Sequence, residues 1–452
     1  MNTQITRWLG LLGLVLLTSL VGSAQGLHGD WAGTLSLPMG KLKLVLHIDL
    51  QREKPSITMD SPQQGAYGLR TQIERLEEKS LRISIAQLML SYEAELRASD
   101  SLVGTFTQGG LRLPLSLARQ QSKSAPTQSA QPKNAEELTF LSADGKTKIA
   151  GTLSTALSGE RKTEVLMIAG SGRTNRDEEV WGHRPFAVLS DSLTKAGYAT
   201  LRYDKRGVGQ SEGRFESATM DDFISDAEGA VVYLKSRGYK RIVLLGHSEG
   251  GIISARIARL RPKDIAAILL LNAPVKPLNE VLIEQNEVQA KALGLPAAEL
   301  ERTARINREL YKLSADASIS DEVLSKRISE HLEFILPASL QGEQRQQVKA
   351  RLVAEMPLPS VRTMLRCKPL EDLRQVRCPI LAVQSELDTQ VLPSNIELLK
   401  QTIPTAQVRR VPGTNHLLQP AKTGLPTEYA TIEQTLAPEA WRAIAELLAR
   451  LY

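Results

Sequence analysis

A short segment near the middle of the chain constrains the fold more than any other feature. Residues 242–245 form a continuous apolar run, Ile-Val-Leu-Leu, as expected of a strand that is buried on both faces. Gly-His-Ser-Glu-Gly follows at residues 246–250, and apolar residues then recur with helical spacing. This order predicts a sharp strand-to-helix turn that lifts the Ser248 hydroxyl above the edge of a sheet. Glycines flank the serine because a side chain would clash where the backbone reverses.

The N-terminal residues predict export. Arg7 precedes an apolar run over residues 8–21, and the small residues Gly-Ser-Ala follow at 22–24. The run is shorter than the roughly 20 residues that a membrane-spanning helix needs. We interpret residues 1–24 as a secretory signal peptide. The expected mature protein is periplasmic or secreted and has no integral membrane segment.

Composition limits the number of domains and the class of partner. A chain of 452 residues is too long for one hydrophobic core, so two or more domains are expected. The net charge of +6 is spread without a basic block, and aromatic residues make up 4% of the chain, which argues against a nucleic-acid partner. No cysteine and histidine cluster is spaced for zinc. Cys367 and Cys378 either pair across a short loop or remain two unpaired thiols.

Two regions with different residue patterns lie on either side of a polar, proline-containing stretch. Residues 27–119 contain short alternating runs separated by turn residues, which predicts a small all-β domain. This domain is either a module that binds a carbohydrate or another surface, or a packing appendage. Residues 120–133 have the composition of a linker.

From residue 134 to 452, strand-like runs alternate with helical periodicity, which predicts an α/β fold with a mostly parallel eight-stranded sheet. The first two strands are expected to form a hairpin around Asp144-Gly145. The expected strands are 138–142, 148–153, 165–168, 199–203, 242–245, 266–271, 380–383 and 407–411, and the expected helices are 184–196, 220–237, 251–261, 394–401 and 438–451.

The alternation stops between about residues 275 and 360, where the sequence is highly charged and helical in period. This segment is interpreted as a helical insert between the sixth and seventh strands. It is either a cap over a substrate pocket or a helical excursion without a role in substrate access.

A serine hydroxyl needs a base within hydrogen-bonding reach to act as a nucleophile. The sequence has histidines at positions 28, 47, 183, 247, 331 and 416. Two of them fall in the β domain, one precedes the serine, one lies in the helical insert, and His247 is a neighbour that cannot easily turn back onto Ser248. His416 remains, in the loop Pro-Gly-Thr-Asn-His-Leu after the last strand, where parallel sheets gather their chemistry.

The base in turn needs a carboxylate to orient it and to stabilise its charged form. Asp388 follows the strand at 380–383 closely, and Glu386 is its competitor two residues earlier. The chain order Ser248, Asp388, His416 is the one expected for this kind of fold.

An oxyanion hole is expected from two backbone amides. The first is the N–H of Glu249, at the start of the helix. The second belongs to the loop Ala-Gly-Ser-Gly at residues 169–172, where we choose Ser171, with Gly172 as the alternative.

These motifs together resemble those of an α/β-hydrolase of the serine aminopeptidase/carboxylesterase branch, similar to bacterial esterase D-type enzymes. The resemblance covers residues 138 to 452 and implies hydrolysis of short-chain carboxylic esters through an acyl-enzyme. Two departures are a Ser-Glu-Leu-Asp acid loop without its usual leading glycine, and Glu249, whose carboxylate would disfavour anionic substrates. The motifs are Ala169-Gly-Ser-Gly, Arg176-Asp-Glu, Tyr203-Asp-Lys-Arg-Gly-Val-Gly-Gln-Ser, Gly246-His-Ser-Glu-Gly-Gly, Leu387-Asp and Pro412-Gly-Thr-Asn-His-Leu.

The segment 204–211 contains Gly-Val-Gly but no complete phosphate-binding or dinucleotide fingerprint. We expect no cofactor from it, and interpret it as a tight loop fixed by a pair between Asp204 and Arg206.

The sequence thus predicts an exported serine carboxylesterase with a small-molecule ester substrate. An exported aminopeptidase would use the same three residues, and Glu284 and Glu287 of the insert could then hold a free amino terminus. A hypothesis from another class is a non-catalytic protein whose β domain captures envelope or glycan. The sequence indicates no oligomeric state.

Overall fold

The computed structural model of the chain divides into two compact units, Met1–Ala130 (the β unit) and Gln131–Tyr452 (the α/β unit). The division falls inside the predicted linker. The predicted signal peptide and linker residues 121–133 lie outside the described residues. The structure describes residues 25–37, 40–50, 55–61, 66–85, 90–97, 100–108, 111–120, 134–157, 163–292, 294, 296–335 and 342–451.

The β unit is one antiparallel sheet in the order β4-β3-β2-β1-β9-β8-β7-β6-β5. Buried and less buried residues alternate along its strands, as in β3, so one face of the sheet forms an apolar core. The sequence predicted the all-β class here but not every strand. The strands are β1 (Gly29–Leu37), β2 (Gly40–Asp49), β3 (Ser56–Ser61), β4 (Ala66–Arg70), β5 (Gln72–Leu76), β6 (Ser80–Ile85), β7 (Leu90–Arg97), β8 (Ser101–Gln108) and β9 (Leu111–Arg119), after a short 3-10 turn at Gln25–Leu27.

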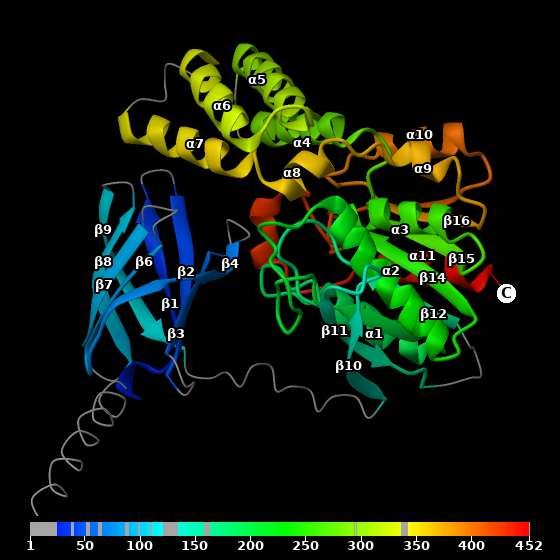
Figure 1. The fold of residues 1–452 in the computed structure, drawn as a ribbon, viewed down its shortest axis with the longest axis horizontal. Helices are drawn as coiled ribbons and strands as arrows, with labels where there is room; N and C mark the ends of the chain where they lie inside the picture. The colour runs from blue at the N-terminus through cyan, green and yellow to red at the C-terminus, as the bar shows by residue number, and fades with distance from the viewer. Residues whose placement is uncertain are drawn as a thin grey trace, which may run out of the picture. The chain divides into compact units, whose positions relative to one another are not determined.

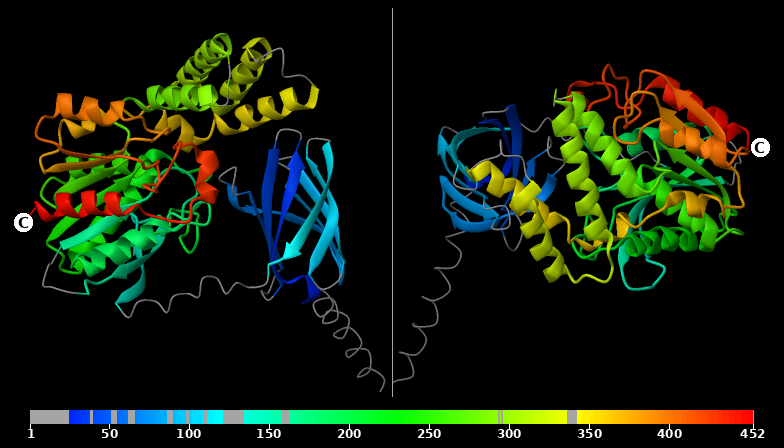
Figure 2. Two further views of the ribbon diagram at one scale, coloured as in Figure 1. Left: turned by 180° about the vertical axis from the view of Figure 1, so that it is seen from behind. Right: turned by 90° about the horizontal axis from the view of Figure 1, so that it is seen from above.

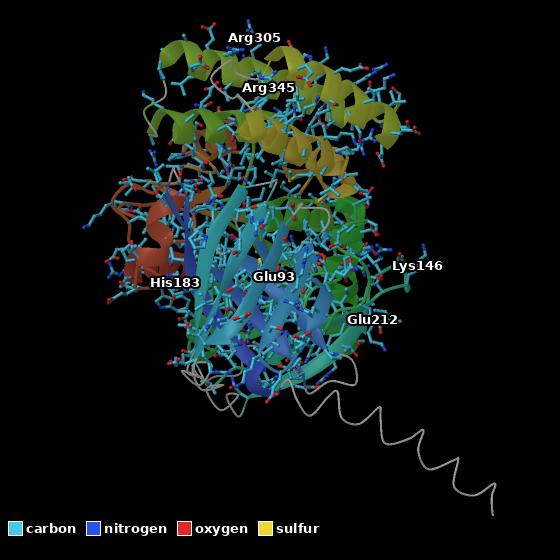
Figure 3. All side chains as sticks on the ribbon, turned by 90° about the vertical axis from the view of Figure 1, so that its left-hand side faces the viewer. Glu93, Lys146, His183, Glu212, Arg305 and Arg345 are labelled. Atoms are coloured by element: carbon cyan, nitrogen blue, oxygen red, sulfur yellow. The ribbon has the colours of Figure 1, made fainter. Side chains whose placement is uncertain are left out.

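The α/β unit is built on an eight-stranded sheet in the order β10-β11-β13-β12-β14-β15-β16-β17 (Figure 1). The predicted hairpin is present, since β10 pairs antiparallel with β11, and Lys146, labelled in Figure 3, lies in its turn. The pairing of β11 with β13 is also antiparallel, and the other five pairings are parallel. The strands are β10 (Ala135–Leu141), β11 (Lys148–Ser154), β12 (Thr163–Ile168), β13 (Ala199–Tyr203), β14 (Arg241–His247), β15 (Ile265–Leu271), β16 (Ile380–Ser385) and β17 (Gln407–Val411).

Helices cover both faces of this sheet. On one face α1 (Pro185–Lys195) and α11 (Pro438–Ala449) enclose an apolar cluster with the central strands. On the other face α2 (Met220–Ser236) and α3 (Glu249–Leu260) share a second cluster with α9 (Pro369–Leu373) and α10 (Ser394–Thr402). Helix α2 begins where the Thr219 side chain accepts a hydrogen bond from the Asp222 amide.

The helical insert between β15 and β16 has its own small apolar core. Figures 1 and 2 show its long helices as a layer separate from the helices that flank the sheet. Arg362 links α8 to the end of α5, because its guanidinium donates to the backbone carbonyls of Ser314 and Asp316. The insert contains α4 (Leu278–Ala292), α5 (Ala297–Ala315), α6 (Asp321–Ile335), α7 (Gly342–Glu355) and α8 (Pro359–Met364).

The structure also bears on membrane-spanning segments and on the pairing of the two cysteines. Every helix in the described part of the chain is too short or too polar to cross a bilayer. Cys367 and Cys378 are both free thiols rather than a disulfide.

Candidate active site

Ser248 occupies a strained turn between β14 and α3. Its backbone has φ 51° and ψ −122°, in the left-handed half of conformational space that residues other than glycine rarely adopt. A Cβ atom on Gly250 would lie 1.9 Å from the Ile168 carbonyl oxygen, and one on Gly246 would lie 2.3 Å from the Gly250 oxygen. The two glycines are therefore required by close packing, as the motif predicts.

Helix α3 starts directly after the serine, with Glu249 as its first residue. The Ser248 amide donates to the Leu271 carbonyl at 3.0 Å, which fixes the turn to the end of β15. The first amides of a helix have no acceptor within the helix, and its N-terminus favours negative charge. The amide of Glu249 is in this position.

Asp388 and His416 form a buried pair at the ends of β16 and β17. The His416 Nδ1 lies 2.8 Å from Asp388 Oδ2, and both side chains are almost fully shielded from solvent. The other carboxylate oxygen accepts from the amides of Gln390 and Val391 at 2.8 and 2.9 Å. Glu386, the competitor in the sequence, is exposed. The geometry therefore selects Asp388, and it leaves Nε2 of His416 as the nitrogen that faces away from the acid.

The backbone of His416 is fixed by two contacts, one with the elbow and one with the residue after β15. Its carbonyl oxygen lies 2.9 Å from His247 Nε2 and accepts a bond from Asn272 Nδ2 at 2.8 Å. The imidazole rings of His247 and His416 lie 4.8 Å apart between centroids. These contacts bring the loop after β17 beside Ser248.

Asn272 is a residue that the sequence analysis missed. It directly follows β15, has φ 47° and is fully buried. Its amide oxygen accepts from the Ser385 N–H at 2.7 Å, so one side chain links β15, β16 and the His416 loop. No local sequence signal distinguishes such an asparagine from an ordinary turn residue.

The loop after β12 contains the predicted second oxyanion donor. Ser171 and Gly172 are exposed there, and Gly172 has φ 93°. The amide of Gly170 donates to Glu178 Oε1 at 2.6 Å and is therefore already occupied. A Cβ atom on Gly170 would lie 3.2 Å from the Ser248 Cβ, which places this loop against the serine.

Glu249 does not place an uncompensated charge at the site. Its Oε1 lies 2.8 Å from Lys205 Nζ, and both side chains are less than a tenth exposed. Lys205 also donates to the carbonyl oxygen of Gly170 at 2.5 Å. The expectation that Glu249 disfavours anionic substrates is therefore not supported, because a buried cation pairs with it. Lys205 instead ties the elbow helix to the Gly170 loop.

The expected pair between Asp204 and Arg206 is wrong. Asp204 accepts hydrogen bonds from the Arg176 backbone amide at 2.8 Å and from its guanidinium at 2.8 Å. Arg206 instead pairs with Asp226, at 2.6 Å, and with Asp222. Asp204 and Arg206 lie only two residues apart in a tight loop, and yet each pairs with a charged residue on another segment.

His247 and Glu178 form a second buried histidine–carboxylate pair. The Nδ1 of His247 lies 2.8 Å from Glu178 Oε1, and both side chains are less than a tenth exposed. Burial opposes protonation of His247, but the Glu178 carboxylate outweighs it and raises the pKa of the imidazole. Glu178 has φ 52°, so its backbone is held in an unfavourable conformation. The sequence analysis named His247 only to eliminate it as the base.

The remaining histidines of the α/β unit have other partners. His183 Nδ1 lies 2.9 Å from the Thr435 hydroxyl, and His331 pairs with Glu309 between α5 and α6. Behind His247 is a small cavity of about 10 Å³, lined in part by Phe186 and Leu418, with room for about one water molecule. No group of three or more potential metal ligands occurs among the described residues.

The sheet, the elbow and the histidine–carboxylate pair together define the α/β-hydrolase fold in this chain. Residues 183–419, more than half of the chain, match the family described as serine aminopeptidase, S33. The chain belongs to this family. The match includes Ser248, Asp388 and His416, and it does not include the β unit.

Relatives with assigned names match shorter stretches. Esterase EstD of Thermotoga maritima is 31% identical over 149 residues, which are 33% of this chain and 35% of that protein. The mouse serine hydrolase BPHL is 30% identical over 118 residues, 25% of this chain and 37% of that protein. The matches therefore span about a third of the length of these relatives.

Solved structures are similar at lower identity. The esterase Pf2001 of Pyrococcus furiosus is 17% identical, with a TM-score of 0.41 over 70% of this chain and 91% of that chain. The proline iminopeptidase of Mycobacterium smegmatis is 16% identical, with a TM-score of 0.43 over 70% and 98%.

Proposed function

We propose that the chain is an exported serine carboxylesterase that hydrolyses short-chain acyl esters through an acyl-enzyme intermediate. The observation that carries this proposal is that the loop of the buried Asp388–His416 pair contacts the strained Ser248 elbow through His247. The similarity to Esterase EstD over a third of the chain favours an ester substrate. Export is supported by the N-terminal sequence, with its apolar run and small residues at 22–24.

The proposed reaction follows from the direction of each group. His416 Nε2 removes the proton of the Ser248 hydroxyl, whose oxygen attacks the ester carbonyl carbon. Asp388 holds the Nδ1 proton and stabilises the imidazolium that forms. The amides of Glu249 and Ser171, with Gly172 as the alternative, stabilise the oxyanion. The intermediate collapses, the alcohol leaves with the proton from His416, and water then hydrolyses the acyl-enzyme by the same steps.

An aminopeptidase is the second candidate, because the matched family is described by that activity. Such an enzyme needs acidic side chains that are available to a free amino terminus. Glu284 forms an ion pair with Lys276, and Glu287 lies 3.6 Å from Arg308. Both carboxylates that the sequence suggested for this purpose thus have cationic partners, which favours the ester substrate.

The test compares the purified protein with its Ser248→Ala variant on p-nitrophenyl acetate, p-nitrophenyl butyrate and aminoacyl p-nitroanilides. We expect the parent to cleave the esters faster than the anilides. The variant should lose at least about 10³-fold in kcat, because an acyl-enzyme cannot form without the hydroxyl. A variant that keeps most of the parent's ester turnover would contradict the proposal.

A matched pair of variants tests the choice of acid. Asp388→Asn should lower kcat about as strongly as the serine variant, because an amide cannot stabilise the imidazolium. Glu386→Gln changes an exposed carboxylate two residues away and should leave kcat within about twofold of the parent. The reverse result would assign the acid to Glu386.

A further inference from the structure

The elbow residue His247 makes contacts that neither composition nor motif explains. Its Nδ1 faces a carboxylate oxygen of Glu178 at 2.8 Å, and its Nε2 faces the backbone carbonyl oxygen of His416 at 2.9 Å. Both of these groups only accept hydrogen bonds while Glu178 is ionised. A neutral imidazole carries one N–H, so it can satisfy only one of the two contacts. With Glu178 ionised, both contacts are hydrogen bonds only if the ring is an imidazolium, which carries two N–H groups.

The carboxylate of Glu178 serves two donors with the same oxygen. Its Oε1 accepts from the Gly170 amide at 2.6 Å in addition to the contact with His247. Glu178 is itself fixed by a turn in which its amide donates to the Asn175 carbonyl at 2.9 Å. One chain of contacts therefore runs from the Gly170 loop through Glu178 and His247 to the backbone of His416.

We propose that His247 is held as an imidazolium by Glu178, and that this buried ion pair is a positioning device for His416 and for the Gly170 loop. This inference rests on the proposed function, in which His416 is the base and the loop at 169–172 contributes to the oxyanion hole. The pair takes no proton from the substrate. It fixes the main chain of the base to the turn that carries the nucleophile, where a displacement of about 1 Å can lower the rate about 100-fold.

Three further titratable groups lie near His247: the His416 ring, whose centroid is 4.8 Å away, and the carboxylates of Asp388 and Glu249. On the His416 side the carboxylate of Asp388 lies behind His416, to which it is bonded at 2.8 Å. Two residues along the chain from His247, at the start of α3, Glu249 is paired with Lys205 at 2.8 Å, so it adds little net charge. The pKa of His247 is raised in these surroundings, against the effect of burial and because of the Glu178 carboxylate. The positioning contact is therefore present at low and neutral pH and is lost as pH rises through that pKa.

The direct test reads the protonation state of His247 without reference to activity. NMR of the full chain with ¹⁵N-labelled histidine should show both ring nitrogens of His247 protonated at pH 7. Its signals are assigned by their absence in His247→Gln and confirmed by elimination with single variants of the other histidines, so a poorly folded variant does not remove the test. A neutral ring protonated at Nε2 alone would overturn the inference, because Glu178 would then carry the proton.

The kinetic test uses Glu178→Gln and His247→Gln. Loss of the counter-charge should move the alkaline limb of the kcat profile of Glu178→Gln about 1–3 pH units toward acid. His247→Gln should lower kcat about 100-fold with KM nearly unchanged. His331→Gln, which changes the His331–Glu309 pair between the insert helices α5 and α6, should alter neither. An alkaline limb that stays in place in Glu178→Gln would overturn the inference.

The two proposals fail in different ways. If Ser248→Ala keeps its ester turnover, the proposed function is wrong, whatever the state of His247. If Ser248→Ala is inactive but His247 is neutral at pH 7, only the positioning role is wrong.

Discussion

The β unit and the α/β unit differ in how many charged residues they bury. Among the described residues of the β unit, no Asp, Glu, Lys, Arg or His is buried, and its core is apolar. Its ion pairs are exposed or half-buried; the pair between Glu93, labelled in Figure 3, and Arg75 at 2.8 Å is an exposed one. The buried charged residues of the α/β unit are Glu164, Asp177, Glu178, His183, Asp204, Lys205, Arg206, Asp226, His247, Glu249, Arg362, Asp372, Asp388 and His416.

This difference indicates that folding alone does not explain the buried charges of the α/β unit. A buried ionised group is expensive unless it is paired and hydrogen-bonded, so a unit that only has to fold can do without one. Several buried charges of the α/β unit gather where β12 to β17 end, around the Ser248 elbow, and they occur there as pairs. Such pairing supplies fixed charges and fixed geometry to a reaction. The comparison can be tested by changing one charge at a time.

The largest effect is expected from Lys205→Met. The variant leaves the Glu249 carboxylate buried without its partner, and should lose about 3–5 kcal/mol in free energy of unfolding of the α/β unit. Urea unfolding followed by circular dichroism measures this loss. The double variant Lys205→Met/Glu249→Leu should recover most of it, because no unpaired charge remains.

The control for that prediction is Lys326→Met on α6. Lys326 and Glu330 form an exposed pair at 3.9 Å, and its loss should change the unfolding free energy by less than about 0.5 kcal/mol. A similar loss in Lys205→Met and Lys326→Met would remove the distinction between buried and exposed pairs.

A smaller effect of opposite sign is expected at Glu164. Neither of its carboxyl oxygens has a hydrogen-bond partner among the described residues, and burial raises its pKa well above the ordinary value. Glu164→Met should therefore stabilise the chain, by about 1–3 kcal/mol for the removed polar group. As pH rises above the ordinary pKa, the unfolded chain releases this proton while the folded chain keeps it, so the parent loses further stability. The thermal midpoint of the variant should therefore exceed that of the parent by more at pH 8 than at pH 5. If variant and parent have equal thermal midpoints at both pH values, Glu164 is solvated in the folded chain.

The smallest effect is expected in the β unit. His47 lies between Asp60, at 2.9 Å, and Asp30, at 2.8 Å, and the hydrogen bond with Asp60 is the main reason that its pKa is raised to about 9. The stabilisation is present below the ordinary pKa of about 6.5 and is lost as pH rises through about 9. His47 is more than a third exposed, so His47→Gln should cost less than about 1 kcal/mol at pH 6 and less still at pH 10. Urea unfolding at the two pH values measures this difference. A cost that grows with pH would contradict the assignment.

The features that could be predicted from the sequence are those that depend on the residue pattern along the chain. Every expected strand of the α/β sheet is present. The central strands are buried on both faces and therefore appear as apolar runs between helical segments. His416 could be identified by elimination because histidine is scarce in this sequence. Asp388 followed from its position just after a strand, and its contact with His416 agrees with that choice.

The features that could not be predicted from the sequence are contacts between residues that lie far apart in the chain. Glu178 reaches His247 across 69 residues, and Lys205 reaches Glu249 across 44. Charged residues are common in loops, so nothing local marks these two as buried. The error over Asp204 and Arg206 has the same cause, since nearness in the chain suggested a pair that the fold separates.

The two free cysteines have a practical consequence. Burial raises the pKa of Cys367 to about 12 and that of Cys378 to about 11, and thiols that stay protonated react slowly with alkylating reagents. They are the two cysteines of the sequence. A cysteine introduced at Val323, 44% exposed on α6, should therefore take a fluorescent label selectively. Motion of the insert helices during turnover can thus be followed by spectroscopy without first removing the native thiols.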